Sequence, residues 1–146
     1  MCIRDSLSDP ACARLLMALS GTLHLVSDYG LFTTLAVLDA GGLLGSLHSV
    51  HVGRGPARVA DPGYLPSVCR GLGISRHARC VYIDSNAGAI VAAKLLGWEG
   101  CLVARPTGAL RRTGSGGHRV GHGAWYDRRF ATLRRALSYY IFGEKA

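Results

Sequence analysis

Two clusters of small polar and acidic residues follow short apolar segments, where parallel-sheet proteins commonly place binding and catalytic side chains. The first cluster follows residues 23–26 and the second follows residues 80–83. The clusters consist of Ser27 and Asp28 in the first, and of Asp84, Ser85 and Asn86 in the second. A hydroxyl can donate a hydrogen bond to a phosphate oxygen, and a carboxylate can hold a hard cation such as Mg²⁺. The chemistry that these residue types favour is therefore phosphate or metal binding.

The same residues also have simpler interpretations. Ser27 at the end of a strand is suited to capping the following helix, and Asp84 is suited to capping a helix over residues 87–96. A cap and a phosphate or metal site are compatible, so both interpretations of Asp84 stay open. Asp28 is interpreted as a solvent-facing or capping residue, and the Ser85–Asn86 pair as caps or substrate-loop residues.

Short apolar runs alternate with segments of helical periodicity, and they predict the strands and helices that position these clusters. Strands are predicted at residues 23–26, 48–52, 80–83 and 101–104, and helices at residues 9–19, 31–38, 62–71 and 87–96. Strands that alternate with helices of about ten residues favour right-handed crossovers and a parallel sheet. The predicted fold class is therefore α/β, with a Rossmann-like parallel sheet and flanking helices.

The composition of the 146-residue chain fits one domain or a large part of one. Hydrophobic residues make up 49%, yet no apolar run reaches the roughly 18 residues that span a membrane. The five cysteines are scattered without metal-site spacing, and no secretory pattern is visible at the start. They are interpreted as buried, reduced thiols, which predicts a cytoplasmic protein.

The net charge of +8 is concentrated near the C-terminus. Residues 1–104 carry eight basic and seven acidic residues, whereas residues 105–146 carry nine and two. Residues 107–125 are predicted to form a Gly/Arg-rich loop or linker, and residues 126–146 a basic amphipathic helix. Such a helix is able to contact nucleic acid or an anionic membrane surface. The favoured interpretation is instead that its apolar face packs on the core.

The first residues look foreign to the rest of the chain. Residues 1–5 read MCIRD, which matches the translation of a sequencing-adapter end. Residues 1–6 are therefore interpreted as non-native, and residues 7–106 as a partial α/β core. This interpretation predicts that the natural N-terminus is missing.

Three segments resemble conserved motifs of the haloacid dehalogenase (HAD) superfamily. Residues 80–103 resemble the fourth motif, in which acids end a strand before an Ala-rich helix and a Gly. Residues 23–28, LHLVSD, resemble the second motif. Asp61 and Pro62 resemble the end of the third motif, which normally reads Lys-Pro-Asp-Pro. The likeness covers roughly residues 9–106.

The resemblance implies a specific activity for a longer parent protein. Such enzymes attack a phosphate ester with an Asp and form an aspartyl-phosphate intermediate, with Mg²⁺ neutralising charge. The implied substrates are small phosphorylated metabolites or nucleotides. Ser27 would hold the phosphoryl group and Asp84 would hold the metal, while Asp28, Ser85 and Asn86 would lie at the substrate.

The chain also departs from the family pattern. Val59 and Ala60 occupy the Lys-Pro positions, with Arg58 one residue away, and Ser85 occupies the second acidic position. The Asp-Ser-Asn triplet is similar to the Ser-Ser-Asn of metal-free 2-haloacid dehalogenases, but Ala89 replaces their further Asp. The alternatives are therefore such a dehalogenase-like enzyme or a non-catalytic HAD-like binding or scaffold protein.

The first family motif, a strand ending in the nucleophilic Asp, has no counterpart before residue 27. In the family this strand lies centrally, between the strands predicted here at residues 23–27 and 80–83. We therefore expect either a gap between those two strands or their direct pairing. We also expect the chain as given to be catalytically inactive.

Overall fold

Strands and helices alternate along most of the chain in the computed structural model, which describes residues 10–19, 21–53, 59–75, 77–103 and 126–143. The elements are α2 (Pro10–Ala18), β1 (His24–Ser27), α3 (Leu31–Ala40), the 3-10 helix η1 (Leu44–Ser46), β2 (Ser49–Val52), α4 (Tyr64–Leu72), β3 (Val81–Asp84), α5 (Ala87–Leu95), β4 (Glu99–Val103), β5 (Arg128–Phe130) and α6 (Leu133–Phe142). The predicted α/β class with parallel strands and flanking helices is confirmed.

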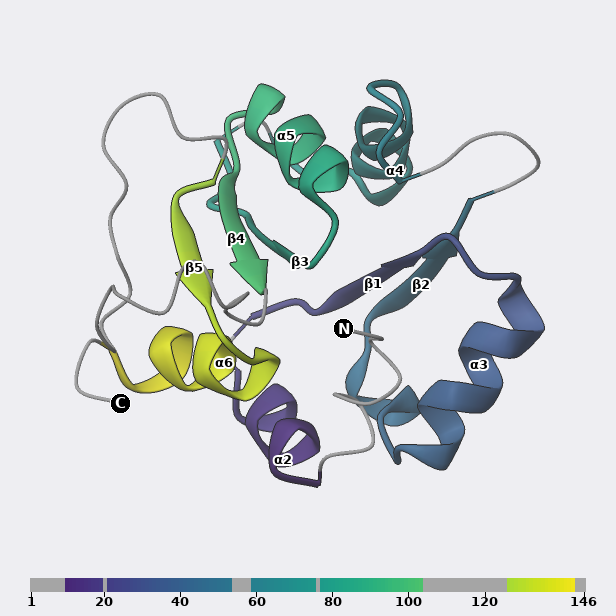
Figure 1. Ribbon diagram of the computed structural model, residues 1–146. Helices are drawn as coiled ribbons and strands as arrows, with labels where there is room; N and C mark the ends of the chain where they lie inside the picture. The colour runs from purple at the N-terminus through teal and green to yellow at the C-terminus, as the bar shows by residue number, and fades with distance from the viewer. Residues whose placement is uncertain (1–9, 20, 54–58, 76, 104–125, 144–146) are drawn as a thin grey trace.

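The strands form two separate parallel sheets instead of one. β1 pairs with β2, and β3, β4 and β5 pair in that order. The two sheets lie apart in Figure 1, and β1 is not paired with β3. Of the two arrangements predicted for these strands, the structure therefore has the gap.

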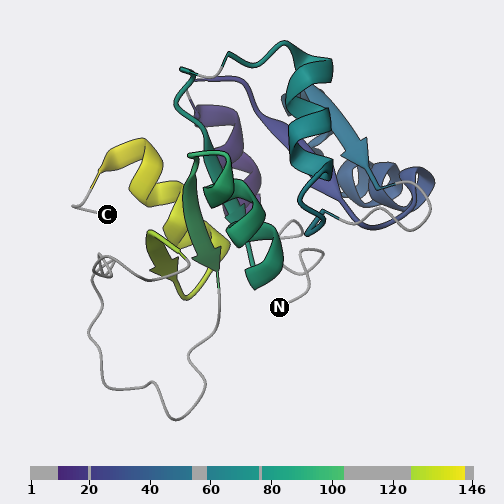
Figure 2. The same ribbon diagram turned by 90° about the horizontal axis from the view of Figure 1, so that it is seen from above.

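Two groups of helices cover opposite faces of both sheets. α4 and α5 lie above the strands in Figure 1, while α2, α3 and α6 lie below them. Seen from above, α4 lies over the β1–β2 pair and α5 over β3 and β4 (Figure 2). The upper core contains Leu65, Tyr82 and Ile90, and Val26 of β1 packs against it. Below, Leu133 contacts both remaining clusters of the core, so the helix layers continue where the sheet is interrupted.

The ends of the helices around the upper core follow local sequence signals. Gly73 terminates α4 in the left-handed conformation, with φ of 64°, which favours glycine. Asn86 caps α5, because its side-chain oxygen accepts a hydrogen bond from the Gly88 amide at 2.9 Å. These caps fix where the helices meet the strand ends.

The C-terminal segment corrects the prediction of one helix over residues 126–146. Residues 128–130 form β5, and α6 begins only at Leu133, capped by the Thr132 side chain. The strand forms because Arg128 pairs with Glu99 of β4 at 2.8 Å and Phe130 is buried. The predicted packing of the helix on the core is confirmed, since Leu137 is 1% exposed.

Several predictions fall on residues outside the described ranges. These are the non-native interpretation of residues 1–6, the loop at residues 107–125 and the placement of Arg58 beside the family's Lys position. In the part of the chain that the structure describes, no helix is long and apolar enough to cross a membrane. The cysteines found there, which include Cys101, are not in disulfides. Burial raises the pKa of the Cys101 thiol to about 12.

Candidate functional site

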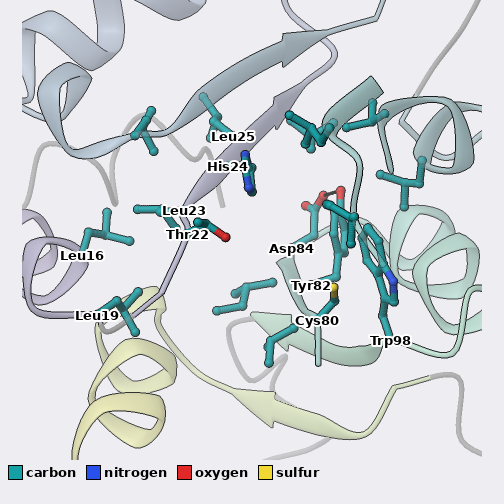
Figure 3. Close-up of a pocket in the computed structure, with 18 of the residues that line it drawn as sticks. Leu16, Leu19, Thr22, Leu23, His24, Leu25, Cys80, Tyr82, Asp84 and Trp98 are labelled. Carbon is teal, nitrogen blue, oxygen red and sulfur yellow. Dashed lines mark hydrogen bonds between the residues drawn. The ribbon is translucent and has the colours of Figure 1, made fainter. Parts of the chain in front are cut away.

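The two predicted clusters lie at the carboxyl ends of β1 and β3, which belong to different sheets. Ser27 is the last residue of β1, and Asp84 is the last residue of β3. A cavity of about 610 Å³ separates the strands and is lined by both of them. In Figure 3, His24 from β1 and the Tyr82–Asp84 pair from β3 point into the same space. Of the predicted site residues, Asp84 and Ser85 line the cavity, whereas Ser27, Asp28 and Asn86 are not among its lining residues.

Ser27 holds the turn between β1 and α3. Its hydroxyl oxygen accepts hydrogen bonds from the Tyr29 amide and from the buried Thr34 hydroxyl, both at 3.1 Å. Neither bond uses the hydroxyl proton of Ser27. The interpretation of Ser27 as the cap of the following helix is wrong, because Gly30 is the N-cap of α3 and no side chain caps it. The Ser27 proton is left to donate to an anionic oxygen.

Asp28 fixes the segment that leads into α4. One of its carboxylate oxygens accepts a hydrogen bond from the Val59 amide at 2.8 Å, across 31 residues of sequence. Val59, which occupies the position of the family lysine, is itself 3% exposed in the upper core. Asp28 is exposed, but it also ties the end of β1 to this loop.

Asp84 closes the turn between β3 and α5. One oxygen accepts hydrogen bonds from the Ser85 amide at 2.6 Å and the Asn86 amide at 3.0 Å. The other oxygen accepts from the Tyr82 hydroxyl at 3.1 Å (Figure 3). Ser85 lines the cavity, whereas Asn86 uses its side chain to cap α5. Asp84 therefore presents negative charge beside the positive end of a helix.

Tyr82 is a site residue that the sequence analysis missed. Burial raises the pKa of its hydroxyl well above its usual range, and the nearby charges of Asp84 and Asp28 raise it further. The phenol therefore stays protonated and donates to Asp84. The alternation of side chains along β3, which places residues 82 and 84 on one face, was the available signal.

The described residues do not by themselves form a magnesium site. Among residues 10–19, 21–53, 59–75, 77–103 and 126–143, no group of three or more His, Cys, Asp or Glu could hold a metal ion. Both oxygens of Asp84 already accept hydrogen bonds from the protein. Mg²⁺ needs several oxygen ligands in octahedral geometry, which one engaged carboxylate does not supply. Metal binding by Asp84 therefore stays a prediction for a longer protein.

Three histidines surround Ser49 on the β1–β2 pair. The Ser49 hydroxyl lies 2.7 Å from His24 Nδ1 and 2.7 Å from His51 Nε2. His48 precedes β2, and its Nδ1 accepts a hydrogen bond from the Leu23 amide at 3.1 Å. The strand register brings His24 opposite Ser49. This cluster was not predicted, because it depends on pairing between residues that are 25 positions apart.

The histidine cluster predicts loss of stability in mild acid. Burial lowers the pKa of His24 below its usual value, and the nearby His48 and His51 lower it further. The unfolded chain then binds the proton more readily, so stability is complete above about pH 6.5 and decreases as the pH falls below it. We expect the urea midpoint at pH 5.5 to lie below that at pH 7.5.

Replacing His24 should reduce this pH dependence. The variant His24→Gln should show a smaller difference between the two midpoints, whereas His77→Gln, at an exposed position, should behave like the unchanged protein. An equal difference in the unchanged protein and His24→Gln would contradict the assignment.

No protein-family model matches the chain, and no curated protein is significantly similar to it.

Proposed function

We propose that this chain is part of a HAD-like hydrolase core that acts on small phosphorylated metabolites or nucleotides. The observation that carries the proposal is that Ser27 and Asp84 end two strands, one from each parallel sheet, and that residues of both strands line one cavity. Both residues stand at the positions that the sequence motifs assign to phosphate chemistry. The proposal includes a longer parent, since the described residues include no candidate for the nucleophilic Asp on a strand beside them.

The two residues would have different roles. The Ser27 hydroxyl, whose proton is not used within its turn, would donate to an oxygen of the phosphoryl group. Asp84, held by two amides and the Tyr82 hydroxyl, would keep its orientation in the lining of the cavity. Mg²⁺, where the parent completes a site for it, would neutralise charge on the phosphate.

The test compares the chain alone with a longer protein recovered from the upstream gene. We expect the longer protein to release phosphate from p-nitrophenyl phosphate with Mg²⁺ present, and the chain alone to be inactive. Ser27→Ala should lower kcat by about 10²-fold, as does removal of one transition-state hydrogen-bond donor elsewhere. Asp84→Ala should abolish activity.

Two further variants separate a chemical from a structural role. Asp84→Asn keeps one side-chain oxygen and nearly the size of the aspartate. The variant should therefore remain folded, as measured by circular dichroism, yet lose activity. Asp39→Ala, at an exposed acid on α3, should be fully active. An inactive longer protein, or an active and folded Asp84→Asn, would overturn the proposal.

A non-catalytic HAD-like binding protein is the second candidate. It is favoured by the hydrophobic Val59 in place of the family lysine and by Ser85 in place of the second acid. Under this alternative, the longer protein would bind inorganic phosphate without turnover. Phosphate would then shift the amide NMR signals of Ser27 and Ser85, and Mg²⁺ would not be required.

A further inference from the structure

Ser49 carries a hydroxyl that lies between two histidine rings. Its oxygen is 2.7 Å from His24 Nδ1 and 2.7 Å from His51 Nε2. A serine hydroxyl has one proton, and a neutral imidazole has one N–H group and one acceptor nitrogen. Ser49 can therefore donate its proton to one ring while it accepts a hydrogen bond from the other. A serine bonded to a histidine that can take its proton is the arrangement that activates a serine nucleophile.

The pairing of β1 and β2 places these three side chains on one face of the sheet. The register pairs His24 with Ser49. It also pairs Val26 with His51, and side chains at alternate positions of a strand share a face. Val26 packs against the upper core, so this is the face that α4 covers (Figure 2). His24, Ser49 and His51 are all partly exposed, so the hydroxyl is not sealed inside the core.

His24 is the one of the two rings that borders a space for a ligand. It lines the cavity of about 610 Å³, whereas His51 is not among the lining residues. Figure 3 shows the His24 ring pointing into that space. Burial and the nearby His48 and His51 lower the pKa of His24, so its ring is unprotonated at neutral pH. His24 is therefore placed to take the proton of Ser49 and to pass it to a group leaving from the cavity.

The cavity beside His24 favours an apolar ligand. Its lining includes Val26 of β1 and Leu65 and Val68 of α4. Its volume of about 610 Å³ falls within the range of ~300–1,000 Å³ that small-molecule pockets occupy. Each methylene of a ligand that is buried against such walls favours binding. An ester with an apolar acyl chain combines this burial with a carbonyl carbon that a serine oxygen can attack.

We propose that Ser49 is a nucleophile toward esters of apolar carboxylic acids, with His24 as its general base and His51 as the ring that positions it. The Ser49 oxygen forms a bond to the acyl carbon while its proton passes to His24 Nδ1. The bond between the acyl carbon and the alcohol oxygen breaks, and the alcohol leaves with that proton. Water then attacks the acyl-serine in the same way, which releases the carboxylic acid and restores the hydroxyl. This inference is independent of the proposed function, which concerns phosphate at Ser27 and Asp84.

The test uses the 146-residue chain with p-nitrophenyl acetate and p-nitrophenyl hexanoate at neutral pH. We expect p-nitrophenol release above the rate in buffer, with kcat/KM about tenfold higher for the hexanoate, because its longer chain buries more apolar surface. Ser49→Ala should reduce the rate to that in buffer. Ser67→Ala, at an exposed serine of α4 whose hydroxyl donates to the Tyr64 carbonyl, should match the unchanged chain.

A covalent probe identifies the nucleophile directly. An alkyl fluorophosphonate forms a bond from its phosphorus to a reactive serine oxygen and releases fluoride. Mass spectrometry of the unchanged chain should place one phosphonyl group on Ser49. This measurement needs no variant, so it does not depend on whether Ser49→Ala folds.

Glutamine substitutions separate the roles of the two histidines, because glutamine has an N–H donor but is not a base. His24→Gln should lower kcat by about 10²-fold or more, as loss of a general base does. His51→Gln should keep most of the activity, whereas His51→Ala should lose it, and circular dichroism checks that each variant is folded. No hydrolysis by the unchanged chain, hydrolysis that survives in Ser49→Ala, a phosphonyl group on another serine, equal kcat/KM for the two esters or equal losses in the two glutamine variants would each overturn the proposal.

Discussion

Replacing Glu99 with alanine is expected to lower the free energy of unfolding by about 1.5–3 kcal/mol, the range for hydrogen bonds that involve charged groups. The Glu99 carboxylate accepts hydrogen bonds from Arg128 Nε at 2.8 Å and from the Tyr140 hydroxyl at 2.7 Å. The Arg128 side chain is only 12% exposed, so its charge would lose a partner without gaining full hydration. Urea denaturation at pH 7 measures the change.

The surroundings of Glu99 provide a matched control. Arg79 lies 3.6 Å from the same carboxylate, but its side chain is 83% exposed. Because solvent screens such a pair, Arg79→Ala should change stability by less than about 1 kcal/mol. Equal effects of Glu99→Ala and Arg79→Ala on the free energy of unfolding would contradict the assignment of the stabilisation to Arg128 and Tyr140.

The pH dependence gives the same prediction a second readout. Burial opposes ionisation of Glu99, but hydrogen bonds from Tyr140 and Arg128 and the charges of Arg128 and Arg79 outweigh it and lower its pKa. The stabilisation is therefore complete above the unfolded-state pKa of about 4.3 and is lost as the pH falls through the lower folded-state value. Glu99→Gln should reduce the loss of stability over this acid range.

Local signals were sufficient to predict most of the elements around the upper core. The end of α4 at Gly73 and the cap of α5 at Asn86 depend on residues within a few positions of each other. The apolar runs and the strand–helix order also placed Ser27 and Asp84 at strand ends. These features form from backbone conformation and nearby hydrogen bonds, so short patterns in the sequence carry them.

Features held by distant contacts could not be predicted in this way. Residues 128–130 continue a helical pattern, yet Arg128 is held as a strand by Glu99 and by the Tyr139 ring, whose centroid lies 4.4 Å from the guanidinium carbon. The His24–Ser49 contact likewise requires the register of β1 and β2. The role of Asp28 at Val59 depends on a loop 31 residues away. Contacts between residues far apart in the sequence determine each of these three features.

A methyl group added at Gly100 is expected to lower the free energy of unfolding by about 1–3 kcal/mol, as overpacking of a core does. A β-carbon at this position of β4 would lie 2.7 Å from Ile90 Cγ2 and 3.1 Å from Lys94 Cγ. Ile90 is fully buried, so its branch methyl has no space to move into. The β4–α5 contact must therefore shift in Gly100→Ala.

Gly71 supplies a control with the opposite sign. It lies within α4, and a β-carbon there would meet no atom within 4 Å. Gly71→Ala should therefore raise the free energy of unfolding by about 0.5–1 kcal/mol, because alanine favours the helix over glycine. Thermal and urea unfolding of both variants measure these changes in the free energy of unfolding. If Gly100→Ala were as stable as the unchanged protein, α5 would not pack on β4 as closely as the contact at Ile90 requires.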